Sequence, residues 1–238
     1  MSWVASERYR VRQAPAGLAL VQELINTRAI SDYAPDLLAD RESAERWLTG
    51  AAGEWARIHG LGSPDCALSP SDPRALRDLR DSFERLLTTT PPASDTDPAA
   101  DETPRPAPAS VRGGGPVRGV TVRLAPDEQG QVQLLPVGRG RDWLESALWS
   151  ETLLAQRAGT WARLKICRNG ECGSSFYDTS RNNSGVWHDV RICGNAVNLR
   201  ASRQRKRIRA AAESDSKHKD EAAAKDKGKG KDKGAPTG

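Results

Sequence analysis

Three of the chain's four cysteines lie within 27 consecutive positions, and a histidine lies among them. The spacing is Cys-x4-Cys, then fifteen residues, then His-x4-Cys, and the four side chains are Cys167, Cys172, His188 and Cys193. Zinc prefers four soft or borderline ligands in a tetrahedron, and two short loops that each present a pair supply them well. Glycines near the ligands, such as Gly173 and Gly194, favour tight turns there. The pattern predicts a segment that folds around one structural Zn²⁺ ion.

The alternative interpretation of this segment is three buried free thiols and one surface histidine. Its apolar side chains are few: Phe176, Tyr177, Val186, Trp187 and Ile192. About fifty residues do not make a stable core from so little apolar surface, and a structural metal supplies the missing stability. Because protein fills all four ligand positions, no open position remains for water or substrate. We therefore expect no enzyme activity at this site, and the rest of the chain shows no catalytic constellation.

Positive charge is concentrated around and after the cysteines. The net charge of the chain is +5, but residues 161–210 alone carry eleven basic and three acidic side chains. Residues 199–209 consist mostly of good helix formers and contain no acidic residue, so like charges repel along the expected helix unless an anion is present. A helix of this kind suits phosphate contacts along nucleic acid. The candidate contact residues are Arg181, Arg191, Arg200, Arg203, Arg205, Lys206, Arg207 and Arg209. The alternatives are a solvated basic helix, or one that docks on the acidic N-terminal part of the chain.

The first 160 residues are expected to form one mostly helical domain with a β-hairpin. Apolar side chains recur at helical spacing over 16–30, 36–60, 71–87 and 141–159, and β-formers flank a turn signal near residues 126–130. The tryptophans of this domain lie on the apolar stripes and are predicted to be core residues. His59 ends a predicted helix beside Gly60 and is predicted to be exposed.

Two segments have a composition that favours disorder. Residues 88–116 are rich in Pro, Ala, Asp, Thr and Gly, and residues 211–238 alternate Lys with Asp and Gly. The predicted organisation is therefore a helical domain over 1–160 with a disordered insert at 88–116, a metal module with a basic helix over 161–210, and a disordered tail over 211–238. No run of about eighteen apolar residues suggests a membrane span, and the N-terminus lacks the apolar stretch of a signal peptide, so a cytoplasmic location is expected.

The cysteine segment and the basic residues after it resemble a known family, the CGNR-type zinc fingers of bacteria. The resemblance rests on Cys172-Gly173, Phe176, Asp178-Thr179-Ser180-Arg181-Asn182, Trp187 and Cys193-Gly194-Asn195, followed by the basic segment. "LALVQELINT" over 18–27 is similar, more weakly, to the opening of the ABATE-type domain that precedes such fingers. The resemblance implies a stress-linked transcription regulator whose C-terminal end is zinc-ribbon-like and binds nucleic acid.

The chain departs from the family pattern near the metal ligands. His188 stands where members usually have a third Cys, which is conservative for zinc. Ala196 replaces the Arg of the C-G-N-R motif, Asn198 stands where Lys is frequent, and Gly185-Val186 replaces common arginines. These changes remove positive charge near the metal, so the helix over 199–209 is left as the main candidate for contacts. The Asp178-Thr179-Ser180 motif is predicted to form a structural turn, in preference to placing Arg181 on phosphate.

The hypothesis from the sequence is a zinc-stabilised, DNA-binding transcription regulator. The N-terminal domain would sense a small-molecule or protein effector, or mediate homodimer formation. An RNA-binding protein that uses the same surface is the first alternative. The second is a protein-interaction module in which zinc only maintains the shape.

Overall fold

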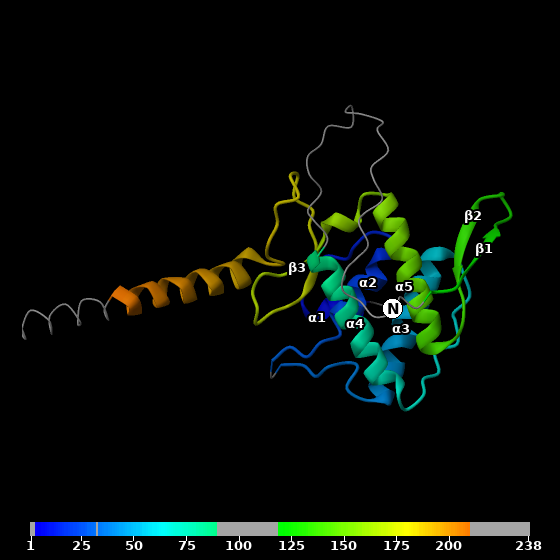
Figure 1. Cartoon of the computed structure of the whole chain (residues 1–238), viewed down its shortest axis with the longest axis horizontal. Helices are drawn as coiled ribbons and strands as arrows, with labels where there is room; N and C mark the ends of the chain where they lie inside the picture. The colour runs from blue at the N-terminus through cyan, green and yellow to red at the C-terminus, as the bar shows by residue number, and fades with distance from the viewer. Residues whose placement is uncertain (1–2, 32, 90–118, 210–238) are drawn as a thin grey trace, which may run out of the picture. The chain divides into compact units, whose positions relative to one another are not determined.

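This computed structural model describes residues 3–31, 33–89 and 119–209. Within these ranges the fold is mainly helical, with two small antiparallel hairpins. The N-terminal region contains α1 (Val4–Arg8), α2 (Leu18–Ile25), α3 (Arg41–His59), α4 (Asp72–Thr89), β1 (Val122–Pro126), β2 (Val132–Pro136) and α5 (Gly140–Arg157), as Figure 1 shows. Each helix predicted from apolar spacing is present, and so is the predicted hairpin.

The helix ends follow local sequence chemistry. Asp40 caps α3 by accepting a hydrogen bond from the Ser43 backbone at 2.9 Å, and Ser43 returns the contact in a capping box. Gly60 then ends the helix with a left-handed φ of 65°, which a residue with a side chain rarely adopts. In α4, Pro73 follows Asp72 in the first turn, where its missing N–H leaves no helical bond unmade.

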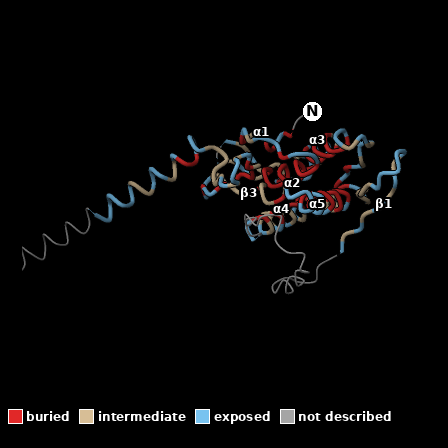
Figure 2. The backbone as a smooth tube through the Cα atoms, turned by 90° about the horizontal axis from the view of Figure 1, so that it is seen from above, coloured by how far each residue is buried: buried red, intermediate tan, exposed pale blue. Residues whose placement is uncertain are grey.

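Helix α2 lies at the centre of the fold. All eight of its residues are buried, and it contacts α1, α3, α4, α5 and β4 (Figure 2). Leu20, Val21 and Leu24 are completely buried among the core residues. A helix surrounded by protein on every side has no solvent face, so each of its polar side chains needs a partner within the protein.

The polar side chains of α2 find those partners in the polypeptide backbone. Glu23 accepts hydrogen bonds from the backbone N–H groups of Ala5 and Ser6 at 2.6 and 2.9 Å, and so satisfies the N-terminus of α1. Burial raises the pKa of Glu23, and these donors oppose that rise. Gln22 accepts from the Ala14 N–H at 2.6 Å. Helix α2 therefore fixes the path of the N-terminal segment.

A second hairpin extends the fold beyond residue 160. After the short 3-10 helix η1 (Trp161–Arg163), strand β3 (Leu164–Ile166) pairs antiparallel with β4 (Ser175–Tyr177). Strand β4 was not predicted from the sequence. Trp161 and Leu164 belong to the same hydrophobic core as the helices. The first hairpin strand of the predicted metal module is therefore built into the helical domain.

Asn26, just after α2, joins the helical core to β4. Its side-chain amide accepts from the Ser175 N–H at 2.8 Å and donates to the Ser175 carbonyl at 3.1 Å. The Ser175 hydroxyl donates to the Gln22 carbonyl at 3.0 Å. Asn26 and Ser175 are both fully buried, so neither backbone group has water as an alternative partner.

The chain divides into two compact units, residues 1–189 and 190–238. This division differs from the predicted boundary at residue 160, because η1, β3 and β4 pack with the helices. Thr88 and Thr89, the first residues of the predicted insert, continue α4. The rest of that insert and the predicted tail lie outside the described residues. No helix in the described ranges is long and apolar enough to cross a bilayer.

The prediction that His59 is exposed is wrong. Its ring lies 4.2 Å from the Trp55 ring, and its Nε2 lies 2.9 Å from Glu151 Oε1 of α5. Trp55 donates to the same oxygen at 2.7 Å. The partner carboxylate comes from a residue far along the sequence, and for that reason the helix-end position of His59 gave no sign of it.

Substitution of Asn26 by Ala is expected to destabilise the protein by about 2–4 kcal/mol. The change leaves the Ser175 N–H buried without a partner, at about 1–3 kcal/mol, and leaves the Ser175 carbonyl with only a longer hydrogen bond of 3.5 Å from Gln22 Nε2. Urea denaturation of the zinc-loaded protein measures the effect. The control is Asn182→Ala at an exposed position, which should change the free energy of unfolding by less than about 0.5 kcal/mol. Equal effects of the two variants would contradict the role given to Asn26.

Candidate metal centre

The structure brings the four predicted ligands together. One ligand atom from each of Cys167, Cys172, His188 and Cys193 lies within 4.8 Å of the others. Ligands about 2.0–2.3 Å from a tetrahedral zinc ion stand roughly 3.5–3.8 Å apart, so a single ion fits among these atoms. Cys172 Sγ lies 3.3 Å from His188 Nδ1, which is close to that spacing. The three thiols and the one imidazole form a Cys3His donor set.

The first ligand pair lies on a tight turn after β3. The Cys167 N–H donates to the Ser174 carbonyl at 2.8 Å, which closes the loop across the hairpin. The N–H groups of Cys172 and Gly173 both donate to the Asn169 carbonyl, at 2.8 and 3.2 Å. Gly173 has a left-handed φ of 60°, which lets the chain pass directly from the turn into β4. The loop is thereby shaped to point both sulfurs the same way.

Hydrogen bonds around the sulfurs favour the thiolate form, which is the form that binds zinc, at Cys172. The Cys167 thiol donates to Cys172 and, together with the His188 ring and the Ser174 hydroxyl, lowers the pKa of Cys172. The Ser174 hydroxyl oxygen lies 3.2 Å from Cys172 Sγ. The same contact to Cys172, together with burial, raises the pKa of Cys167. Backbone N–H groups of His188 and Asn169 act in the opposite direction at Cys167, by donating to its sulfur.

Asp178 organises the loop that leads to His188. One carboxylate oxygen accepts from Lys165 Nζ and from the Gly185 N–H, both at 2.7 Å, and the other accepts from the Ser180 N–H at 2.8 Å. These donors hold the pKa of Asp178 well below its usual range, although burial opposes them. Lys165 also donates to the carbonyls of Asn183 and Gly185. A half-buried ion pair with satisfied oxygens therefore ties β3 to the second ligand loop.

The predicted turn at Asp178-Thr179-Ser180 is present. The Ser180 N–H bonds back to the Asp178 side chain, as in an Asx-turn. The cation that pairs with the Asp178 carboxylate is Lys165. Arg181 itself is exposed.

Gly185 has a steric role that its sequence context did not reveal. A Cβ atom at this position would lie 2.8–2.9 Å from the carboxyl atoms of Asp178. From the sequence, Gly185 was only a position where a positive charge had been lost. The structure adds that the close approach of its backbone lets its N–H reach the Asp178 carboxylate.

The fourth ligand and the basic residues lie on consecutive turns of helix. Cys193 belongs to a π-helical turn, Val190–Gly194, and residues 195–209 continue as α-helix. The predicted basic helix is therefore present. The side chains that the sequence singled out there are exposed, and they are Arg191, Arg200, Arg203, Arg205, Lys206, Arg207 and Arg209.

These features define a small Cys3His module of the zinc-finger class. Comparison with known families agrees, since residues 163–206 match the family model for the CGNR zinc finger. The match includes all four ligands and most of the basic helix. It leaves the helices before residue 163 unassigned, and a search of curated proteins found no match to the chain.

The residues that support the ligands were not found from the sequence. Lys165, Ser174 and Gly185 each lie near a ligand or a motif, but none has a spacing signal of its own. Their roles depend on contacts with Asp178 or Cys172, which only the folded loops bring within reach. The sequence indicates these roles only through position: Lys165 lies just before the first ligand, and Ser174 lies two residues after the second.

The purified protein is expected to contain about one zinc ion per chain by elemental analysis. Substitution of His188 by Ala removes a ligand and should weaken zinc binding by more than about tenfold, since loss of a supporting residue alone typically costs 10–100-fold. His188→Cys should retain the ion, because it supplies another thiolate. Competition with a chromogenic chelator measures the affinity. His218→Ala, in the predicted tail, is the control. Gently purified protein without zinc would contradict the assignment.

Substitution of Gly185 by Ala should destabilise the module by about 1–3 kcal/mol, because the new methyl group displaces the Asp178 carboxylate. The matched control is Gly170→Ala in the other ligand loop, where nothing lies within 4 Å of an added Cβ. Urea denaturation and chelator competition report stability and zinc affinity. If the two variants behave alike, the packing of Gly185 on Asp178 is unimportant.

Proposed function

We propose that the protein is a zinc-stabilised nucleic-acid-binding protein, and that it regulates transcription by binding DNA. The observation that carries the proposal is the exposed basic helix that follows Cys193. No acidic residue occurs between Val190 and Arg209, while Arg200, Arg203, Arg205, Lys206, Arg207 and Arg209 are all exposed. Phosphate groups would relieve the repulsion among these cations.

The metal has a structural part in this proposal. Four protein ligands complete the coordination of a zinc ion, so the ion would hold the two ligand loops and the start of the helix in place. Arg200, Arg203 and Arg207 recur at the spacing of one helix side, which suits a row of phosphates. The family match over 163–206 supports the zinc-finger class, and the choice of DNA rests on the charge pattern.

The helical region before residue 160 would provide regulation in this proposal, by sensing an effector or by pairing two copies of the chain. The resemblance of residues 18–27 to an ABATE-type domain, and the stress-linked bacterial role that it implies, belong to the same proposal. We assign no enzyme activity to the chain. A cytoplasmic location is proposed as well, because a reducing compartment keeps zinc-binding thiols free of disulfides.

A protein-interaction module is the second candidate, and one observation favours it. Val190, Ile192, Leu199 and Ile208 are between 56 and 67% exposed, and they lie among the basic residues. Apolar side chains of this kind suit a protein partner better than a phosphate backbone. A partner captured by the zinc-loaded protein after nuclease treatment would favour this candidate. An RNA-binding protein is separated from the DNA-binding proposal by competition between duplex DNA and structured RNA.

Replacement of Arg200, Arg203 and Arg207 together by Ala should weaken binding to duplex DNA and reduce its salt dependence. Each lost phosphate contact lowers the slope of log affinity against log salt by about 0.9, so a decrease of roughly 2–3 is expected. Fluorescence anisotropy at several salt concentrations measures the slope.

The matched control replaces Arg74, Arg123 and Arg157 by Ala. These arginines are exposed and lie outside the metal module, and their replacement removes the same charge. The proposal fails if wild-type protein shows no affinity for duplex DNA at low salt, or if the two triple variants have equal slopes.

A further inference from the structure

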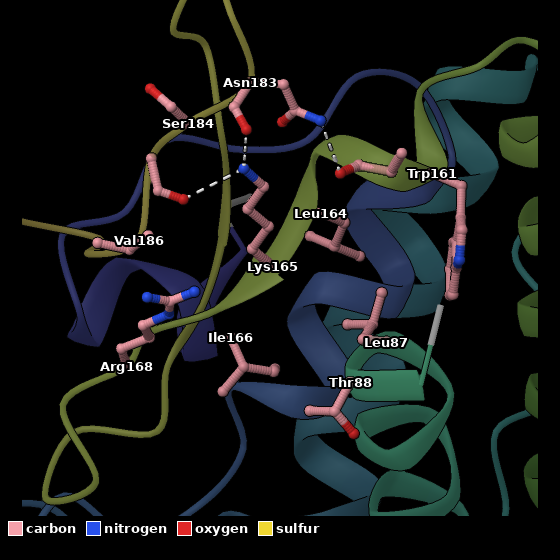
Figure 3. A pocket seen from close by; sticks show the side chains of 12 residues that line it. Leu87, Thr88, Trp161, Leu164, Lys165, Ile166, Arg168, Asn183, Ser184 and Val186 are labelled. Carbon is pink, nitrogen blue, oxygen red and sulfur yellow. Dashed lines mark hydrogen bonds between the residues drawn. The ribbon is translucent and has the colours of Figure 1, made fainter. Parts of the chain in front are cut away.

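A groove of about 480 Å³ lies between α4, η1, β3 and the loop before His188. Its apolar lining includes Leu87, Trp161, Leu164, Ile166 and Val186. Figure 3 shows Trp161 at one end of this set and Arg168 with Val186 at the other. All of these residues belong to the first compact unit, and the groove has no part in holding the metal.

The charged groups of the groove favour an anionic ligand. Among the described residues, the lining contains two cations, Lys165 and Arg168, and no carboxylate. Lys165 is already bound by Asp178 and by two backbone carbonyls. Arg168 is exposed, and no described residue pairs with its guanidinium group. Its backbone N–H donates to the Val186 carbonyl at 3.0 Å, which fixes the base of the side chain at the rim.

Asn183 gives the groove a feature that points to a polar ligand group. It has a left-handed φ of 50°, a conformation that asparagine adopts more readily than most other residues with a side chain. Its side-chain nitrogen donates to the Ala162 carbonyl at 3.2 Å, but its Oδ1 is buried without a hydrogen-bond partner. The unpartnered oxygen costs free energy, and a ligand donor that reaches Oδ1 would recover part of that cost.

A nucleotide with an unpaired base combines the required properties. Its base has flat, largely apolar faces, carries an amino donor at its edge in adenine, cytosine and guanine, and is joined to a phosphate. A base inside a duplex is stacked on both sides and cannot enter a groove, so the ligand must be single-stranded at this point. The backbone phosphate beside the base would then lie within reach of a guanidinium at the rim.

We propose that this groove binds one unpaired nucleotide of a nucleic acid, with the base on Ile166 and Val186 and the phosphate at Arg168. The inference rests on the proposed function, and it adds a second contact besides the basic helix. It also predicts a preference among nucleic acids, because ends, loops and junctions present unpaired bases whereas a blunt duplex does not.

The test compares a blunt DNA duplex with the same duplex bearing a short single-stranded cytosine overhang. Fluorescence anisotropy of the zinc-loaded full chain should show on the order of tenfold tighter binding to the overhang, the scale of one stacked base. Ala162→Phe fills the groove and Arg168→Glu reverses the charge at its rim. Each variant should remove the preference for the overhang.

Arg123→Glu is the matched control, because it makes the same charge change at an exposed position on β1. It should weaken both duplexes equally and keep the preference. Zinc content and circular dichroism of every variant establish that the module is folded. A second groove variant, Ser184→Trp at an exposed lining position, covers the case in which Ala162→Phe fails to fold.

Equal affinity of wild-type protein for the two duplexes would overturn the groove proposal while leaving the proposed function intact. A preference that survives in the folded groove variants and in Arg168→Glu would overturn it as well. If wild-type protein binds neither duplex, the proposed function and the groove proposal both fail.

Discussion

The paired hydrogen bonds between Asn26 and Ser175 are the interaction on which the rest of the structure depends. They join the buried helix α2 to strand β4, and β4 follows directly from the turn that holds Cys167 and Cys172. One side chain pairs with two buried backbone groups, and the Ser175 N–H would have no other partner. The hairpin of the metal module is thus held by the helical core and does not depend on zinc alone.

The metal module is stabilised by polar contacts because it has few apolar residues. Lys165 and Asp178 form a half-buried ion pair that also accepts and donates backbone hydrogen bonds. The Arg168 N–H bonds to the Val186 carbonyl and so links the two ligand loops a second time. These contacts hold the loop that carries His188, so that the His188 ring faces Cys172. They also create the wall of the groove, so the metal loops and the groove share one framework.

The metal ligands and the helices were predicted because both depend on local spacing. Two ligand pairs with x4 spacing fix the donors of one site whatever surrounds them, and helical periodicity follows from 3.6 residues per turn. The burial of α2 on all sides was not predicted, since the apolar face of a helix gives no measure of what covers its other face. Glu23 and Gln22 carried no sequence signal for their backbone partners, which come from the chain before α2.

His59 and Gly185 illustrate the same limit. His59 was predicted to be exposed because it ends a helix beside Gly60, yet Glu151 reaches it from a helix that comes much later in the chain. In the sequence, Gly185 was only a position where the family commonly has an arginine. In the structure, the carboxylate of Asp178 occupies the space where a Cβ of residue 185 would be. The sequence by itself determined the four metal ligands, the positions of the helices and the basic segment, because these follow from residue type and short-range spacing. Only the tertiary structure decided which polar groups meet, where the helical core ends and where the groove lies, because those depend on contacts between residues far apart in the chain.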